Sequence, residues 1–300
     1  MDKGDDILSD AIKRLASAVG IDAIGFAEAA PFSDYALPHS PRRDPRLALP
    51  NARSIIVAGI YVGGLTLPAW DDPRYGRTSR LYLSGFFLDV VEPLRPIAEL
   101  LAREGFESVV CDSSADEHSV LPLKLAAVRA GLGWQGRHSL LISKTYGTFL
   151  ALGGIITDAV LEYNDESEPD RCGKCAECRT SCPMAALDTP YVLQRERCLS
   201  LLLQDEPLPG DVHQAIGNRV GDCEVCQDVC PWNRRHLRNP LATDLTKSFR
   251  GRVRELEDLF SLPFLSTMSE EQYVKELGGF DTGIPYRIFA RNVHIAGKNA

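Results

Sequence analysis

Eight cysteines between residues 172 and 230 have the spacing that most clearly indicates chemistry in this chain. The first run reads Cys172-x2-Cys175-x2-Cys178-x3-Cys182-Pro183. In bacterial ferredoxins this spacing binds 4Fe–4S clusters, and the fourth cysteine of each run ligates the other cluster. Geometry explains the pattern, because thiolates two residues apart can reach three corners of one cubane while the cysteine before the proline points away from it.

A second, stretched set of cysteines follows the first. Cys198 is separated by 24 residues from the run Cys223-x2-Cys226-x3-Cys230-Pro231. Exchange of the fourth ligands between the two runs uses all eight cysteines, so their number agrees with two 4Fe–4S clusters. One cluster is then assigned to Cys172, Cys175, Cys178 and Cys230. The other cluster is assigned to Cys182, Cys198, Cys223 and Cys226.

Zinc sites and disulfides are the alternative uses of these cysteines. A structural zinc site takes four ligands, usually as two pairs well separated in sequence, which does not match three thiols at successive spacings of two. Disulfides are disfavoured in the reducing compartment that we expect for this chain. The ninth cysteine, Cys111, stands alone in an expected strand, and we interpret it as a small core residue.

The overall composition limits the class of protein that contains these cysteines. The chain has 300 residues, of which 44% are hydrophobic and 25% charged, as in an ordinary globular protein of roughly two domains. The net charge of −8 argues against a chain-wide electrostatic grip on nucleic acid. No apolar run approaches the roughly 20 residues that cross a bilayer, and the N-terminus is acidic where a signal peptide is basic. We therefore expect a cytoplasmic protein without membrane contact.

Helices and strands alternate through the first 160 residues, which is typical of an α/β layer architecture. Apolar residues at helical spacing predict helices over 7–19, 88–103 and 120–130. Short apolar runs rich in β-branched residues predict strands over 22–27, 54–62, 108–111, 140–143 and 148–157.

The composition changes at an acidic linker over residues 162–170, which precedes the cysteines. A basic run over 234–254 follows them, and we predict three helices near 253–260, 269–277 and 285–295. Ser269 begins a capping box, and Pro285 suits the first position of the last helix. We predict domains over residues 1–166, 167–240 and 241–300, with the last helices packing back on the core.

Several motifs of the chain resemble the matching segments of epoxyqueuosine reductases. The most specific are Arg197–Leu202, Ile216–Arg219 and Cys223–Asn233, and Ala130–Ser139 and Gly147–Asp158 are also similar. The resemblance covers most of residues 5–300. It implies a cytoplasmic iron–sulfur enzyme that holds cobalamin and reduces the epoxide of a tRNA wobble base to the alkene, in queuosine synthesis. Reductive dehalogenases share this core of clusters and corrinoid, so the architecture is not tied to one substrate.

The resemblance also implies a fold and a set of partners. The fold is α/β (α+β), with a cobalamin-binding-like domain over 1–166, a two-cluster ferredoxin-like domain over 167–240 and C-terminal helices over 241–300. The cofactors are two 4Fe–4S clusters and cobalamin. The partners are an electron donor of the flavodoxin or ferredoxin type and tRNA. Because the chain stops at Ala300, we expect a short member of the family without its HEAT-like C-terminal extension.

The proton donor of the family is an aspartate at a fixed distance before the Gly-Leu-Gly-Trp segment. Counting back from Gly131 places Glu117 there, whereas Asp112 has the more similar local context but lies five residues earlier. Burial beside an apolar corrinoid face would keep such a carboxyl protonated near neutral pH. The alternative is that both acids lie in a solvated loop. A second departure is Tyr82–Leu88, which lacks the polar residues of the family's Gly-x-Asp-Tyr-His motif.

Five residues of the glycine-rich segment are implied to contact the corrinoid: Gly131, Gly133, Trp134, His138 and Ser139. Glycine allows the backbone to approach a planar macrocycle closely, but a glycine after a helix is also an ordinary C-cap. Trp134 equally suits core packing, and His138 equally suits a hydrogen-bonded loop.

The leading hypothesis is a corrinoid-dependent reductase, in which electrons pass from the clusters to cobalt and then to an organic electrophile. A non-catalytic iron–sulfur protein for electron transfer or cofactor handling is the alternative from another class. A corrinoid reductase of a substrate other than tRNA is the third possibility.

Overall fold

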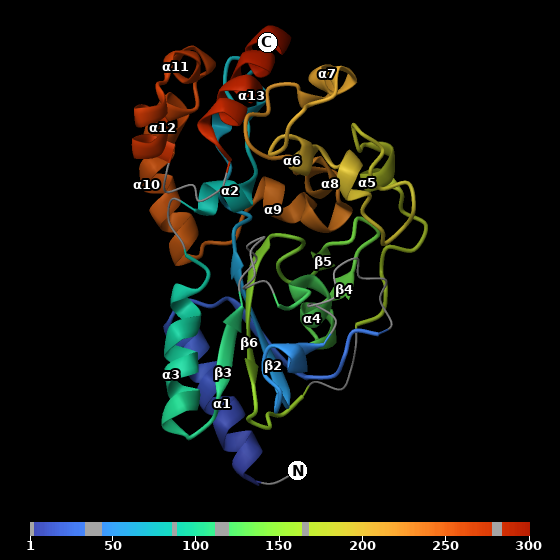
Figure 1. Ribbon diagram of the computed structural model, residues 1–300, viewed down its shortest axis with the longest axis vertical. Coiled ribbons are helices and arrows are strands. Elements are labelled where there is room, and N and C mark those ends of the chain that lie inside the picture. The colour runs from blue at the N-terminus through green and yellow to red at the C-terminus, as the bar shows by residue number, and fades with distance from the viewer. Residues whose placement is uncertain (1–2, 34–43, 86–88, 112–119, 164–167, 278–283) are drawn as a thin grey trace. The chain divides into compact units, whose positions relative to one another are not determined.

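The computed structural model describes residues 3–33, 44–85, 89–111, 120–163, 168–277 and 284–300 (Figure 1). The chain forms two compact units. The first unit contains Met1–Tyr61, Asp89–Gly136 and Leu140–Gly173, and the second contains Val62–Leu88, Arg137–Ser139 and Lys174–Ala300. The division into functional domains at residues 166 and 240 stays a prediction.

A four-stranded sheet forms the centre of the first unit. Its strands are β1 (Ala23–Glu28), β2 (Ser54–Tyr61), β3 (Ser108–Cys111) and β6 (Leu150–Thr157), in the spatial order β1-β2-β6-β3. Every neighbouring pair is antiparallel. The alternation of helices and strands in the sequence therefore does not produce the parallel sheet that such alternation often accompanies.

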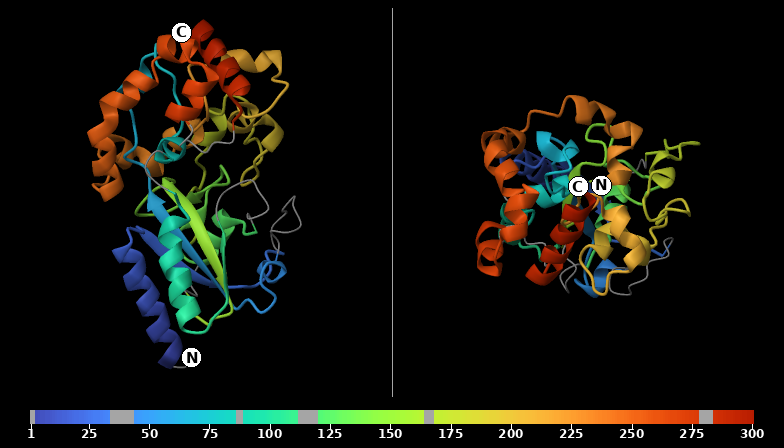
Figure 2. Two further views of the ribbon diagram at one scale, coloured as in Figure 1. Left: turned by 60° about the vertical axis from the view of Figure 1, so that its left-hand side comes forward. Right: turned by 90° about the horizontal axis from the view of Figure 1, so that it is seen from above.

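Both faces of this sheet are covered. All eight residues of β2 are buried, because Ile55 and Val57 face one core while Ile56 and Ala58 face the other. Helices α1 (Lys3–Ala18) and α3 (Arg95–Arg103) lie side by side on one face (Figure 2). Helix α4 (Leu123–Arg129) packs on the other face of the sheet, and the apolar core on that face also contains Cys111. The interpretation of Cys111 as a core residue is confirmed.

Prolines move the starts of two helices of this unit from the predicted positions. Helix α3 begins at Arg95, and residues 92–94 form a separate 3-10 turn, because Pro96 lacks an N–H and fits only the first turn of a helix. Helix α4 begins at Leu123 because Pro122 is its N-cap. The predicted strand over 140–143 is the two-residue strand β5 (Leu141–Ile142), which pairs with an unpredicted strand, β4 (Trp134–Gln135).

The second unit begins with short helical segments that surround the cysteines. They are η3 (Pro68–Asp71), α2 (Arg80–Ser84), α5 (Glu177–Thr180), η5 (Arg195–Arg197), α6 (Leu199–Leu202), η6 (Gly210–Val212), α7 (His213–Ile216), α8 (Val225–Asp228), η7 (Pro231–Asn233) and α9 (Arg234–Arg238). Most span about one turn, too short to be stable alone.

Four longer helices complete the second unit: α10 (Asp244–Leu259), α11 (Leu262–Thr267), α12 (Glu270–Leu277) and α13 (Tyr286–Asn299). Helix α10 begins well before the predicted residue 253, because the Thr243 side chain caps its first turn by accepting from the Thr246 N–H. Helix α11 is not predicted. The predicted capping box of α12 is confirmed, since Ser269 and Gln272 exchange hydrogen bonds of 2.9 and 3.2 Å. Pro285 is the N-cap of α13 rather than its first helical residue.

Helix α13 is anchored to the cysteine segments by a buried asparagine. Asn292 is fully buried and donates from Nδ2 to the carbonyl oxygens of Leu203, at 2.8 Å, and Val220, at 3.1 Å. The predicted mixed α/β fold with C-terminal helices is confirmed. Among the residues that the structure describes, no helix combines the length and apolar character needed to cross a membrane.

Candidate functional site

The structure brings five cysteines from the two runs together in the second unit. The Cys226 thiol lies close enough to interact electrostatically with those of Cys223, Cys198, Cys178 and Cys182. Cys198 interacts with Cys182 in the same way. Cys178 and Cys182 of the first run therefore both lie near the second run, and the exchange of the fourth ligands stays a prediction.

Backbone N–H groups point at several of these sulfur atoms. The Ala186 N–H donates to Cys182 Sγ at 3.3 Å, in the turn that follows the first run. Cys198 is the N-cap of α6, and the backbone N–H groups of Ser200 and Leu201 partly oppose the effect of burial on its pKa. Such donors stabilise negative charge on sulfur, and around a bound cluster they raise its reduction potential.

Burial favours the neutral thiol at three of these positions. It raises the pKa of Cys198, raises the pKa of Cys223 to about 11 against the opposing charge of Arg219, and raises the pKa of Cys226 well above its ordinary value. At neutral pH these sulfur atoms stay protonated until a metal displaces the protons. A half-buried set made only of sulfur donors suits iron–sulfur ligation.

Mononuclear zinc was the alternative to a cluster at these cysteines. Within the described part of the chain, no three His, Cys, Asp or Glu side chains come close enough together to hold a single metal ion. A cubane is larger than one ion, so its thiolate ligands stand further apart.

The first cysteine run is divided between the two units. Cys172 lies in the first unit, whereas Cys175, Cys178 and Cys230 lie in the second. Cys178 and Cys230 are buried, and the Cys172 N–H donates to Asp170 Oδ1 at 2.7 Å. The ligand set of the first cluster stays a prediction from the spacing.

The turn Arg137–Ser139 belongs to the second unit, although its neighbours in the sequence belong to the first. Arg137 Nη1 donates to the Cys175 carbonyl oxygen at 3.2 Å, and its own carbonyl accepts from the Tyr191 N–H at 2.9 Å. His138 is 3% exposed, and Ser139 has a positive φ of 66°. Arg137, which precedes His138 and Ser139 in the sequence, thus contacts the first cysteine run, and the corrinoid contacts of His138 and Ser139 stay a prediction. The contact of Arg137 with that run was not predicted.

The other three predicted corrinoid residues lie in the first unit. Gly131 has a φ of 75° and donates to the Val128 carbonyl oxygen at 3.1 Å, which is the C-cap geometry of α4. A Cβ on Gly133 would lie 2.0 Å from the Ile142 carbonyl oxygen, so close packing of the turn against β5 requires glycine there. Trp134 is 2% exposed. Local packing accounts for all three residues, and their contact with a corrinoid stays a prediction.

Both predicted proton donors, Glu117 and Asp112, lie outside the residues that the structure describes. Within the segment that departs from the family motif, Tyr82 lies in α2, and burial strongly raises the pKa of its phenol.

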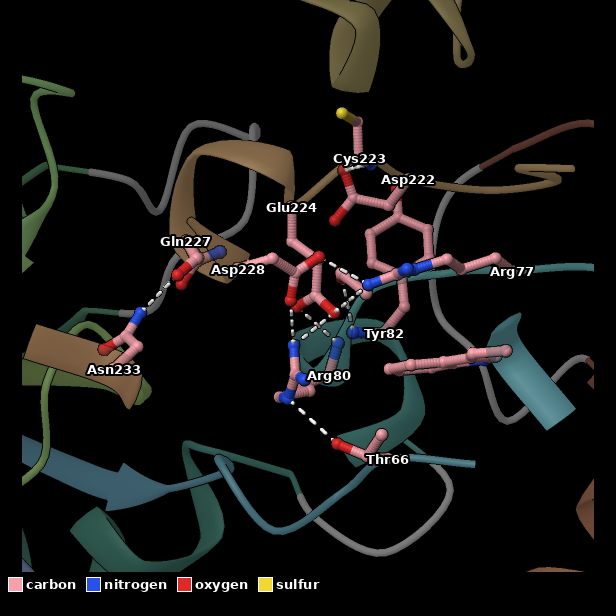
Figure 3. Close-up of polar contacts among 12 residues, drawn as sticks. Thr66, Arg77, Arg80, Tyr82, Asp222, Cys223, Glu224, Gln227, Asp228 and Asn233 are labelled. Carbon is pink, nitrogen blue, oxygen red and sulfur yellow. Dashed lines mark hydrogen bonds and ion pairs between the residues drawn. The ribbon is translucent and has the colours of Figure 1, made fainter. Parts of the chain in front are cut away.

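A buried ion-pair network also lies beside the second cysteine run (Figure 3). Arg77 and Arg80 meet Glu224 and Asp228, which occupy positions on either side of Cys226 in the sequence. The sequence feature that could have indicated this network is the presence of two acids, Glu224 and Asp228, inside a cysteine motif. Their basic partners could not be identified from spacing, because they lie 144 or more residues away along the chain.

Comparison with known proteins agrees with this geometry. Residues 171–233 match the model of the 4Fe-4S double cluster binding domain, which confirms the predicted two-cluster domain. The epoxyqueuosine reductase of Synechococcus is 31% identical over 260 residues, an alignment that spans 77% of each chain.

Solved structures of epoxyqueuosine reductases share the fold. The enzyme from Streptococcus thermophilus superimposes with a TM-score of 0.79 and 25% identity, covering 96% of this chain and 80% of that one. An epoxyqueuosine reductase crystallised with an epoxyqueuosine-modified tRNA stem loop gives a TM-score of 0.77 and 23% identity, covering 98% and 81%. The similarity therefore extends over both units.

Proposed function

Because the chain belongs to the epoxyqueuosine reductase family, we propose that it is an iron–sulfur, corrinoid-dependent reductase of the epoxyqueuosine base in tRNA. The observation that carries the proposal is the presence, in one chain, of a double-cluster domain and an α/β unit that both resemble this family. An electron carrier alone would not need the second feature.

We assign the cysteines to the two clusters as their spacing predicts. Cys182, Cys198, Cys223 and Cys226 hold the second cluster, and their grouping supports this assignment. Cys172, Cys175, Cys178 and Cys230 hold the first. Arg137 places a positive charge beside the first run, where it favours the reduced and more negative state of a cluster.

We propose that cobalamin is held by Gly131, Gly133, Trp134, His138 and Ser139. Gly131 fits this role because it is half-buried and has no side chain, so a planar macrocycle can approach its backbone. When bound, the clusters and cobalamin supply electrons to the epoxide at low potential. Conversion of an epoxide to an alkene takes up two electrons and two protons and releases water. We propose that Glu117 or Asp112 supplies a proton at the epoxide oxygen.

We propose that the basic run over residues 234–254 binds phosphate groups of the tRNA. Arg234, Arg235 and Arg238 are exposed on α9, directly after the second cysteine run. The net charge of −8 opposes this binding, so we expect weak affinity that falls steeply with salt. The electron donor is a flavodoxin or ferredoxin, and the reaction takes place in the cytoplasm, where cysteines stay reduced.

The decisive experiment supplies the anaerobically reconstituted protein with cobalamin, a reduced flavin or viologen and tRNA that contains epoxyqueuosine. The modified nucleoside is followed by mass spectrometry. Appearance of queuosine supports the proposal, and the Cys226→Ala variant is the matched control that should not form it. If cobalt is reduced and queuosine does not appear, the tRNA substrate is wrong and the enzyme reduces another electrophile. If no corrinoid is retained on gel filtration, the protein is an electron-transfer or cofactor-handling protein instead.

A further inference from the structure

Two arginines and two carboxylates beside the second cysteine run form a network in which each arginine contacts both acids, unlike a simple surface ion pair. Arg80 Nη1 lies 2.5 Å from Glu224 Oε1 and 3.0 Å from Asp228 Oδ1, and the Arg80 backbone N–H donates to Glu224 Oε2 at 3.1 Å. Arg77 pairs with Asp228 and lies 3.8 Å from Glu224 Oε1. Figure 3 shows both guanidinium groups pointing at both carboxylates.

Two of these four groups are almost completely removed from water, whereas Arg77 and Asp228 are 18% and 23% exposed. The side chains of Arg80 and Glu224 are 3% and 2% exposed. Trp70 covers the arginines, with its ring centre 5.2 Å from the Arg77 guanidinium carbon and 5.5 Å from that of Arg80. Burying an ion pair costs desolvation free energy that the mutual attraction rarely exceeds, so apolar residues of similar size would stabilise the fold as well. Stability alone therefore does not explain the network.

The position of the acids along the chain suggests what the network does. Glu224 lies between Cys223 and Cys226, and Asp228 lies between Cys226 and Cys230. Helix α8, which contains Cys226, is a single turn that cannot be stable alone. The arginines therefore hold both ends of the segment that presents this cysteine.

We propose that Arg80, assisted by Arg77, is a positioning residue for the second cluster. It clamps α8 through Glu224 and Asp228 and fixes the charge that the cluster experiences during electron transfer. The inference rests on the proposed assignment of Cys182, Cys198, Cys223 and Cys226 to that cluster. It assigns a function in the reaction to residues that do not touch iron.

The test compares Arg80→Gln with Glu224→Gln in the holoprotein by redox titration of the cluster signals with electron paramagnetic resonance. Removing the positive charge should lower the midpoint potential of the second cluster, because reduction adds negative charge. Removing the negative charge should raise this potential. The first cluster should change less. A purely structural defect would not give shifts of opposite sign.

Three further variants make the result unambiguous. Arg80→Lys keeps the charge and should restore most of the potential. If Arg80→Gln loses the cluster, the double variant Arg80→Gln/Glu224→Gln should recover iron, because no unpaired charge stays buried. Arg95→Gln is the matched control, since it removes an arginine from an exposed pair with Glu92 in the first unit and should change neither potential.

The outcomes separate this inference from the proposed function. Wild-type protein that retains fewer than the eight iron atoms of two 4Fe–4S clusters contradicts the ligand assignment. Wild-type protein with both clusters, together with Arg80→Gln and Glu224→Gln variants whose potentials match it or shift in the same direction, overturns only the positioning role.

Discussion

At the scale of single residues, the second cysteine set is arranged for iron by burial and by backbone donors. The buried thiols titrate high, so metal binding must displace protons and depends on pH. Cys111 is buried in the core of the first unit, whereas Cys182, Cys198, Cys223 and Cys226 are half-buried. Burial alone therefore does not identify a ligand.

We predict that Cys226→Ala loses the four iron atoms of the second cluster and destabilises the second unit, because its short helices fold around the ligands. Iron analysis of the anaerobically purified variant measures the loss. The control is Cys111→Ala, which should keep its full iron content. Retention of all eight iron atoms in Cys226→Ala would refute the ligand assignment.

His236 predicts a pH dependence of stability. Burial, together with the charge of Arg235, lowers its pKa from 6.5 to about 4, and its Nε2 accepts from Arg235 Nε at 3.1 Å. Below pH 6.5 the unfolded chain takes up a proton that the folded chain does not, so stability falls between pH 6.5 and about 4. At pH 5.5 the loss should be about 1 kcal/mol.

The His236→Gln variant keeps a hydrogen-bond acceptor and removes the titration. Unfolding free energies of both proteins should be measured between pH 7.5 and 5.5, where iron–sulfur clusters survive. The difference between them should narrow as the pH falls. Parallel curves would show that the pKa of His236 is the same in the folded and unfolded protein.

At the scale of elements, the two glycines of the turn between α4 and β4 are required for different structural reasons. Gly131 ends the helix at a positive φ, and Gly133 allows the backbone of β5 to approach. Gly20 also has a positive φ, of 85°, after α1, but no atom lies within 4 Å of the position of its missing Cβ. The three glycines are therefore not equivalent to substitution.

We predict that Gly133→Ala destabilises the first unit by more than about 2 kcal/mol, because its Cβ collides with backbone that cannot move aside. Gly20→Ala should cost about 1 kcal/mol, the ordinary cost of a left-handed conformation. Chemical denaturation of both variants measures the two losses. Equal losses would mean that β5 shifts freely, and that the glycine serves cofactor contact rather than packing.

At the scale of the whole molecule, the two units differ in what stabilises them. The first has a sheet with an apolar core on each face. The second has short helices around the cysteines, buried apolar residues that include Leu199, Leu203 and Phe260, and anchors such as Asn292. Bound metal should therefore contribute much more to the stability of the second unit.

Removal of iron by an anaerobic chelator should separate the thermal unfolding of the two units. We expect a low-temperature transition of the second unit and a later transition of the first that the chelator barely changes. Hydrogen exchange assigns the transitions, since amides of β2 and β6 should stay protected while those of α5 and α8 exchange. A single transition that moves as a whole would contradict this independence.

The sequence by itself determined the features that depend on local spacing. Cysteines at fixed intervals specify a cluster motif, apolar runs such as Ser54–Tyr61 specify buried strands, and Ser269 with Gln272 specifies a helix start. In each case the physical cause lies within a few residues along the chain. The reach of a cysteine ligand, the two faces of a strand and the capping of a helix end all depend on neighbouring residues.

Only the tertiary structure decided the relations between distant segments. It set the antiparallel order of the sheet, brought Cys178 and Cys182 close to Cys226, and paired Arg80 with Glu224 across 144 residues. Coulomb attraction and hydrogen bonding act on distance in space, and many arginines and acids along the chain could form such a pair. Folding selects the partners, because only a few of them are brought together and removed from water.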